Sequence, residues 1–106
     1  MRQVIKGDHF NDANGNPAGG TTTGLGISIS WQNGPLAVDG VRREPTGAFV
    51  EGVIAAAIDR IEYYQQSRFA SDYNARALDH LRDALAALDA RTRDREQRGV
   101  EGSHAV

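Results

Sequence analysis

Arginines near the C-terminal end of the chain have a spacing that suits anion binding. They follow an apolar series with helical spacing, formed by Leu78, Leu81, Leu85 and Leu88. The same spacing continues to Thr92 and Arg95, where a buried helix face would carry apolar side chains. In a helix, Arg91 and Arg95 lie on successive turns of one face, so their planar guanidinium groups can converge on one phosphate or diphosphate. The pattern therefore indicates an anion site.

The same arginines have a second interpretation. Between Arg91 and Arg98 the basic residues are interspersed with Asp94 and Glu96, which is typical of a solvated helix end whose charges pair with one another. Cations are also favoured at the C-terminal end of a helix by the helix dipole. The spacing alone leaves both interpretations open.

Tyr63 and Tyr64 are candidates for an aromatic surface on which a nucleobase stacks, although packing between helices would explain the same rings. In an antiparallel helical hairpin, Tyr64 and Asn74 lie by the connection, and Arg91 and Arg95 lie at the far end of the second helix. One hairpin cannot bring them together. A two-fold dimer of antiparallel hairpins can place the Tyr64 and Asn74 end of one subunit against the Arg91 and Arg95 end of the other.

The residues typical of an enzyme or a metal site are not grouped in this sequence. His9 lies beside Asp8 and near Asp12, but the three histidines show neither metal-ligand spacing nor a partner nucleophile. The glycine-rich segment 15–20 lacks the Gly-Lys-Ser/Thr of a phosphate-binding P-loop. We therefore predict no catalytic residue, no metal and no cofactor.

Length and composition limit the classes of protein to consider. The chain has 106 residues and no cysteine, so neither disulfides nor thiolate-bound metals can supplement a thin core, and oligomerisation is the expected supplement. Twelve basic and fourteen acidic residues give a net charge of -2, which argues against DNA or RNA duplex binding. No apolar run has the length of a signal peptide or a membrane span. We expect a soluble protein that does not enter a membrane.

The first half of the chain predicts a small antiparallel sheet. Nine of the twelve glycines lie in the first 47 residues. Residues 21–32 alternate apolar and polar side chains, which predicts one strand with Leu25, Ile27, Ile29 and Trp31 on one face. Residues 14–20 predict a tight turn or loop. Shorter strands are expected at residues 3–5 and, as a sheet edge, at 36–38.

The second half predicts two helices. Apolar residues recur at helical spacing from Val50 to Tyr64, so a helix is expected over 47–66 with Thr46 as its N-cap. A second helix follows the break at 67–71, with Ser71 as N-cap and Gly99 as the residue just beyond its end. The predicted fold is α+β: a small N-terminal antiparallel β-sheet followed by a C-terminal antiparallel two-helix hairpin. We divide this single domain into a sheet half (1–45), a hairpin (46–99) and a tail (100–106).

Beyond these patterns, the chain resembles the phage Thoeris anti-defence sponge family. The resemblance covers nearly the whole chain and is carried by His9–Gly20, Ile29–Leu36, Gly47–Glu51, Ala77–Leu81 and Arg91–His104. The C-terminal hairpin is also similar to that of sponges that counter cyclic-oligonucleotide (CBASS) immunity.

The resemblance implies a function and a site. Such sponges act in the cytoplasm of the infected bacterial host, where they bind glycocyclic ADP-ribose and hold it intact. Arg91 and Arg95 would clamp the diphosphate, Tyr64 would stack on adenine, and Asn74 would hydrogen-bond the base or a ribose. The resemblance also implies a homodimer or dimer-based homohexamer, and a second site for cyclic di- or trinucleotides that would include Arg43.

Four alternatives remain open at this point. The chain could be an enzyme that degrades the same signal, or a helical-hairpin module that binds another protein. Tyr63 could replace Tyr64 as the stacking ring. Arg43 could be an ordinary solvated arginine of the loop Arg42-Arg43-Glu44.

Overall fold

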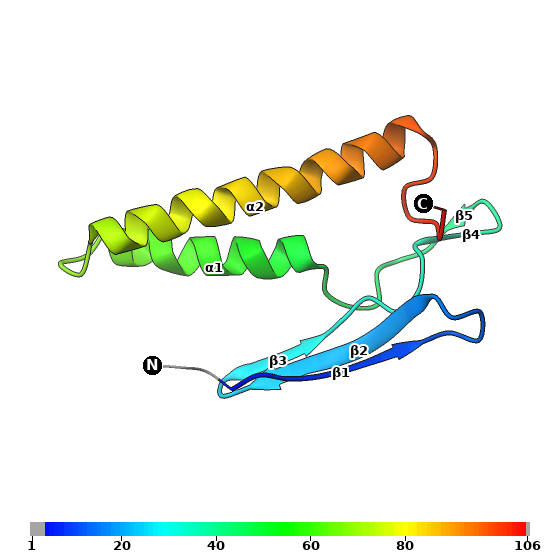
Figure 1. Ribbon diagram of the computed structural model, residues 1–106, viewed down its shortest axis with the longest axis horizontal. Helices are drawn as coiled ribbons and strands as arrows, with labels where there is room; N and C mark the ends of the chain where they lie inside the picture. Colours follow the sequence, from blue (N-terminus) through cyan, green and yellow to red (C-terminus); the bar gives the residue numbers. More distant parts are fainter. Residues whose placement is uncertain (1–3, 106) are drawn as a thin grey trace. The chain divides into compact units, whose positions relative to one another are not determined.

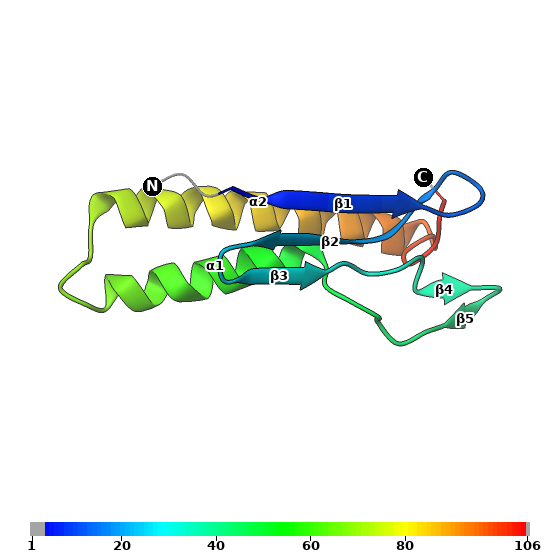
Figure 2. The same ribbon diagram turned by 90° about the horizontal axis from the view of Figure 1, so that it is seen from below.

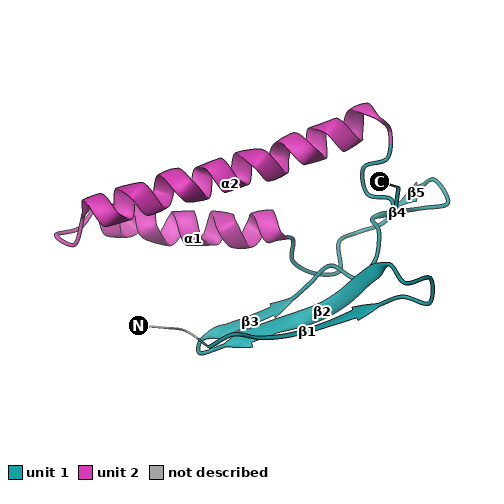
Figure 3. Cartoon of the chain, viewed as in Figure 1, with its two compact units in different colours: residues 1–49, 100–106 teal, residues 50–99 magenta. Residues whose placement is uncertain are grey.

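The computed structural model describes residues 4–105. These residues form two compact units (Figure 3), one made of the chain up to Phe49 together with the segment from Val100, and the other made of Val50–Gly99. Antiparallel strands make up the first unit and two helices the second. The predicted α+β fold, with strands before a helical pair, is confirmed.

The first unit contains a three-stranded antiparallel sheet with β2 in the middle (Figure 2). Its strands are β1 (Lys6–Asn11), β2 (Pro17–Gly24) and β3 (Ile27–Ser30). A second, two-stranded sheet is formed by β4 (Ala37–Val38) and β5 (Val41–Arg42). A strand is therefore present within the expected range 36–38, but it does not form the edge of the first sheet.

The strand predicted over 21–32 is wrong in one respect, because it is two strands joined by a tight turn. Gly24 pairs with Ile27, so Leu25 and Gly26 alone form the connection. Gly26 has a φ of 71°, a left-handed conformation that glycine adopts without steric cost. A two-residue turn keeps the period of two intact, so the alternation of side chains continues across it unbroken.

The beginning of the sheet also differs from the expectation. β1 starts at Lys6, so Val4 and Ile5 precede it, and Gln3 lies outside the described residues. Only the first part of segment 14–20 is a turn, because Pro17 to Gly20 already belong to β2. Within residues 17–20, Pro17 pairs with Asn11 and Gly20 with His9 of β1, and the register is irregular between these two pairs.

Segment 46–48 pairs with the end of β3 before the first helix begins. Trp31 and Ala48 form a parallel bridge, and the Ala48 N–H donates to the Ser30 carbonyl over 2.8 Å. A Cβ on Gly47 would lie 2.6 Å from the Trp31 carbonyl oxygen, so only glycine fits this close approach. The Thr46 hydroxyl accepts from the Asn33 N–H over 3.0 Å. Thr46 is therefore not the helix N-cap that we predicted.

The second unit is a helical hairpin of α1 (Val50–Gln65) and α2 (Asp72–Gln97), which Figure 1 shows side by side. α1 starts three residues later than expected because the chain is still paired with β3 at Ala48. Ser71 caps α2, since its side chain accepts the Asn74 N–H, and Gly99 follows the C-cap with a φ of 73°. Both predicted ends of the second helix are confirmed.

The hairpin has a thin core. Leu78 is the one apolar residue among those described that is buried, at 6% exposure, while Leu81, Leu85 and Leu88 on the same face are half-buried. α2 has 26 residues and α1 has 16, so at ~1.5 Å per residue α2 is longer by about 15 Å. In the described part of the chain, neither helix is both long and apolar enough to cross a bilayer.

Candidate functional site

The connection between α1 and α2 is held by side-chain hydrogen bonds. Gln65 Nε2 donates to the Ser71 carbonyl over 3.1 Å, and the Ser71 N–H donates to Gln65 Oε1 over 2.9 Å. The Ser67 hydroxyl donates to the Tyr64 carbonyl over 2.6 Å and accepts the Phe69 N–H over 3.1 Å. This network fixes the end of α1 against the start of α2, which is where Tyr64 and Asn74 lie.

Tyr63 and Tyr64 form a two-ring surface together with Arg60, and we call these three residues the tyrosine platform. The ring centroids are 6.0 Å apart and the rings are inclined by 53°. The Arg60 guanidinium lies 4.9 Å from each centroid, and its Nε donates to the Tyr64 hydroxyl over 3.2 Å. This hydrogen bond, followed by the electrostatic effect of the same tyrosine, raises the pKa of Arg60. The platform is therefore permanently cationic and accessible to solvent.

Asn74 sits in the first turn of α2, next to the connection. Its Nδ2 donates to the Phe69 carbonyl over 3.3 Å, and its backbone N–H is taken by the Ser71 hydroxyl over 3.1 Å. Asn74 is therefore held in place by its Nδ2 and its backbone N–H, and its side-chain oxygen accepts no hydrogen bond within the described residues.

Two further arginines lie over aromatic rings near the same connection, and the sequence patterns above did not single them out. Arg68 lies 4.7 Å from the Phe69 ring centroid, and Arg76 lies 5.1 Å from that of Tyr73. Both rings are exposed, Phe69 by 64% and Tyr73 by 76%. Arg76 follows Tyr73 by three positions, a helical spacing that could have indicated the pair.

The arginines of the C-terminal end of α2 differ in their exposure and in their contacts. Arg98 Nε bonds Asp94 Oδ2 over 3.1 Å, with both side chains largely exposed, as expected for a solvated helix end. Arg91 is exposed and Arg95 is half-buried, one turn apart on α2. Thr92 is kept on this face by a hydrogen bond of 3.2 Å from its hydroxyl to the Leu88 carbonyl. The spacing of Arg91 and Arg95 suits a shared anion.

The hairpin separates the two groups of predicted site residues. Asn74 and Arg91 belong to the same helix and are about 25 Å apart along its axis at ~1.5 Å per residue. Tyr64 and Asn74 lie at the connection, whereas Arg91 and Arg95 lie beyond the length that α1 can cover. A single chain therefore does not bring the four residues into one site.

Arg43 lies in the other unit, directly after β5. Its backbone N–H donates to the Leu36 carbonyl over 2.6 Å, which continues the pairing of β4 and β5, and its side chain is exposed. The neighbouring Arg42 forms a two-pronged ion pair with Glu101, with N–O distances of 2.5 and 3.1 Å. Arg43 is thus accessible next to an arginine that is engaged within the unit.

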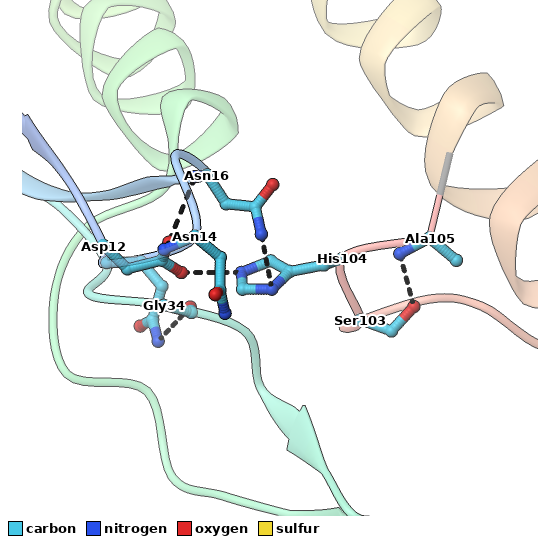
Figure 4. Close-up of polar contacts among 8 residues, drawn as sticks. Asp12, Asn14, Asn16, Gly34, Ser103, His104 and Ala105 are labelled. Carbon is cyan, nitrogen blue, oxygen red and sulfur yellow. Dashed lines mark hydrogen bonds and ion pairs between the residues drawn. The ribbon is translucent and has the colours of Figure 1, made fainter.

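The C-terminal segment belongs to this first unit, and its His104 contacts Asp12. Asp12 is the carboxylate that lies near His9 in the sequence. His104 Nε2 lies 4.0 Å from Asp12 Oδ2, and His104 Nδ1 lies 3.4 Å from Asn16 Nδ2 (Figure 4). The other Asp12 oxygen accepts the backbone N–H groups of Asn14 and Asn16 over 2.9 and 3.1 Å. Asp12 therefore orders the loop between β1 and β2. Over residues 4–105, no three histidine or carboxylate side chains gather as metal ligands would.

Comparison with known proteins gives two matches. Residues 26–93 match the family model described as the Acb2/Tad1 hairpin domain. The protein named Thoeris anti-defense 1 of Bacillus phage SBSphiJ7 is 42% identical over 77 residues, which are 73% of this chain and 51% of that protein. The chain thus spans about half the length of the curated relative that it matches. The family match includes Arg43, Tyr64, Asn74 and Arg91, and ends two residues before Arg95.

Proposed function

The chain belongs to the family of the Acb2/Tad1 hairpin domain, and on this premise we propose that it is a phage anti-defence protein that sequesters glycocyclic ADP-ribose. The name of the phage relative, Thoeris anti-defense 1, supports the biological part of the proposal. The ligand is the signal of Thoeris immunity in the cytoplasm of the infected host. The protein would lower its free concentration and leave it chemically unchanged.

One observation carries the proposed site: the two groups of site residues lie at opposite ends of one hairpin. A two-fold axis between two antiparallel hairpins would set each connection against the other subunit's arginines. Tyr64 and Asn74 of one subunit and Arg91 and Arg95 of the other would then surround one ligand, and the symmetry would create a second, identical site.

The thin core supports the dimer on which this site depends. The leucine face of α2 is mostly half-buried, and α2 is 10 residues longer than α1. Part of this face, with both apolar and polar residues, therefore remains for a second subunit to cover. Chains of about 100 residues commonly supplement a small core by oligomerisation. We propose a homodimer, alone or as the building block of a homohexamer.

Each of the four residues has a chemical role in the proposal. Arg91 and Arg95 would grip the diphosphate through charge-assisted hydrogen bonds. Tyr64 would stack on adenine, and the open side-chain oxygen of Asn74 would accept a hydrogen bond from the base or a ribose. Capture of a scarce signal requires a dissociation constant on the order of nanomolar, or about 12 kcal/mol. Exclusion of water by the dimer would strengthen these contacts.

Sequestration is proposed over cleavage because of the chemistry of the site residues. Two guanidinium groups, a phenol ring and an amide bind and orient a nucleotide, but none of them is a suitable general base near neutral pH. Hydrolysis or cyclic-bond opening would need a base or an activated nucleophile beside the diphosphate.

The proposal includes a second site in the sheet unit. The exposed Arg43 side chain follows the paired Arg42, and a guanidinium in that position can bind a phosphate of a cyclic di- or trinucleotide. Titration of wild type and Arg43→Ala with such a nucleotide tests this part, and equal affinity would remove Arg43 from it.

Calorimetric titration with glycocyclic ADP-ribose tests the main proposal. The bound protein is then heated and the released nucleotide is analysed by chromatography. Tight binding with recovery of the unchanged nucleotide is expected. A time-dependent product would mean that the protein is an enzyme, and an absence of binding heat at several temperatures would favour a protein-binding module.

A further inference from the structure

Arg60 occupies an unusual position for a surface arginine of a helix. It precedes Tyr63 by three residues and Tyr64 by four, so both rings lie on the turn after it. Its guanidinium is 4.9 Å from both ring centroids, and the two rings are inclined by 53°. The cation thus lies over both rings, and its Nε donates a hydrogen bond to the Tyr64 hydroxyl. This arrangement presents a planar, oriented cation to solvent.

No carboxylate in the described part of the chain forms an ion pair with Arg60, although the charge of Asp59 contributes to its raised pKa. Glu62, the nearest acidic residue along α1 toward the connection, is engaged by Arg82 Nη2 over 2.9 Å. Asp59 precedes Arg60 directly but makes no ion pair with it among residues 4–105. A guanidinium carries five N–H donors, and only the Nε–H of Arg60 is used within the described residues. Its Nη groups therefore retain their donors for an anion.

The other two ring-covering arginines differ in this respect. Arg68 and Arg76 each lie over one ring, those of Phe69 and Tyr73. Within the described residues, neither donates a hydrogen bond to the ring residue that it covers. Among these three arginines, Arg60 alone lies over two rings and is hydrogen-bonded to one of the ring residues.

We propose that Arg60 is a ligand-contacting residue whose guanidinium, backed by Tyr63 and Tyr64, is the surface on which the base of an adenine nucleotide stacks. Guanidinium planes stack on aromatic rings, and a base above Arg60 would complete a three-layer stack. The Nη groups have no hydrogen-bond partner among the described residues, and they would donate to a phosphate oxygen of the same ligand. This inference rests on the proposed function and changes which group the base contacts.

Two substitutions of Arg60 distinguish the effect of its charge from the effect of its planar guanidinium group. Arg60→Lys keeps the charge but removes the plane and the forked donors, and Arg60→Met removes the charge as well while keeping a long side chain. Arg76→Lys and Arg76→Met are the matched controls, because Arg76 also covers an exposed tyrosine. Circular dichroism and thermal melting of all four variants establish that they are folded.

Titration of each protein with glycocyclic ADP-ribose gives the result. We expect Arg60→Lys to weaken binding by about tenfold and Arg60→Met by about a hundredfold, with both Arg76 variants within about twofold of wild type. Nucleotide-induced quenching of tyrosine fluorescence should shrink in the Arg60 variants in parallel.

Unchanged or tighter binding by Arg60→Met would overturn the inference. Unchanged binding would mean that Arg60 does not contact the ligand, and tighter binding would mean that Arg60 competes with the ligand for the tyrosine rings. Equal losses of nucleotide affinity in the Arg60 variants and the Arg76 variants would overturn it as well, because a general effect of positive charge would explain such losses. A wild-type protein that binds no nucleotide would overturn the proposed function and the inference together, so the two failures are distinguishable.

Discussion

Gln65 and Ser71 are joined by two hydrogen bonds that run in opposite directions, from Nε2 to the Ser71 carbonyl and from the Ser71 N–H to Oε1. One amide side chain at the end of α1 thereby satisfies both backbone groups of the residue that caps α2. The connection that positions Tyr64 and Asn74 consequently depends on a residue that does not belong to the predicted ligand site.

Replacing Gln65 with alanine should therefore destabilise the hairpin. The Ser71 N–H would lose its partner and the Ser71 carbonyl would keep only the Ala75 N–H, so two hydrogen bonds are lost; at about 0.5–1.5 kcal/mol each, the free energy of unfolding should fall by about 1–3 kcal/mol. Urea denaturation measures the change. The matched control is Gln66→Ala, whose side chain is exposed and has no described partner. Equal stability of the two variants would contradict the role of Gln65.

Gly47 and Gly52 should respond in opposite directions to the same substitution. A Cβ on Gly47 would lie 2.6 Å from backbone atoms of Ser30 and Trp31, so Gly47→Ala should cost about 1–3 kcal/mol of unfolding free energy. Gly52 lies within α1, where an added Cβ would meet no atom within 4 Å, so Gly52→Ala should stabilise by about 0.5–1 kcal/mol through helix propensity. Thermal unfolding of both variants compares the signs, and a stabilised Gly47→Ala would show that the strand-like contact at Trp31 is not formed.

If Arg95 binds the diphosphate as proposed, Arg95→Ala should weaken nucleotide binding by roughly 2–4 kcal/mol, because this charge-assisted contact would be lost. Arg93→Ala is the control, since Arg93 is two positions away and projects from another face of α2. Calorimetric titration of both variants gives the difference. A loss below about 0.5 kcal/mol for Arg95→Ala would remove Arg95 from the site.

The ion pair between Arg42 and Glu101 should contribute little to stability. The two side chains are 59% and 24% exposed, and pairs of this kind are worth at most about 1 kcal/mol. Arg42→Glu should lower the unfolding free energy slightly, and adding Glu101→Arg should restore most of the loss. A large effect that the double variant does not rescue would mean that Arg42 acts through another contact.

The elements of the hairpin were predictable because each depends on local chemistry. The spacing of Leu78 to Leu88 indicated the second helix, and Ser71 and Gly99 set its ends through a side-chain cap and a positive φ. The start of α1 was not predictable in this way. Thr46 is a good N-cap by type, but its hydroxyl bonds Asn33, a residue 13 positions away, and local sequence does not encode that pairing.

The sheet and the tyrosine platform show two other limits of prediction from the sequence. Alternation did not reveal the turn at Leu25 and Gly26, because a turn of even length preserves the period. Tyr63 and Tyr64 could be chosen as candidates by residue type, and their separation from Arg91 and Arg95 followed from helix geometry. The position of Arg60 over both rings depends on the rotamers of three side chains, which spacing restricts but does not fix.

The greater length of α2 has a consequence for amide hydrogen exchange. Its last turns, which carry Arg91 and Arg95, are held by backbone hydrogen bonds without α1 alongside, so these amides should exchange with solvent sooner than those near Leu78. A ligand that bridges this end to another subunit would slow the exchange there in proportion to occupancy. Deuterium uptake across α2 would then report capture of the nucleotide, with no label on either molecule.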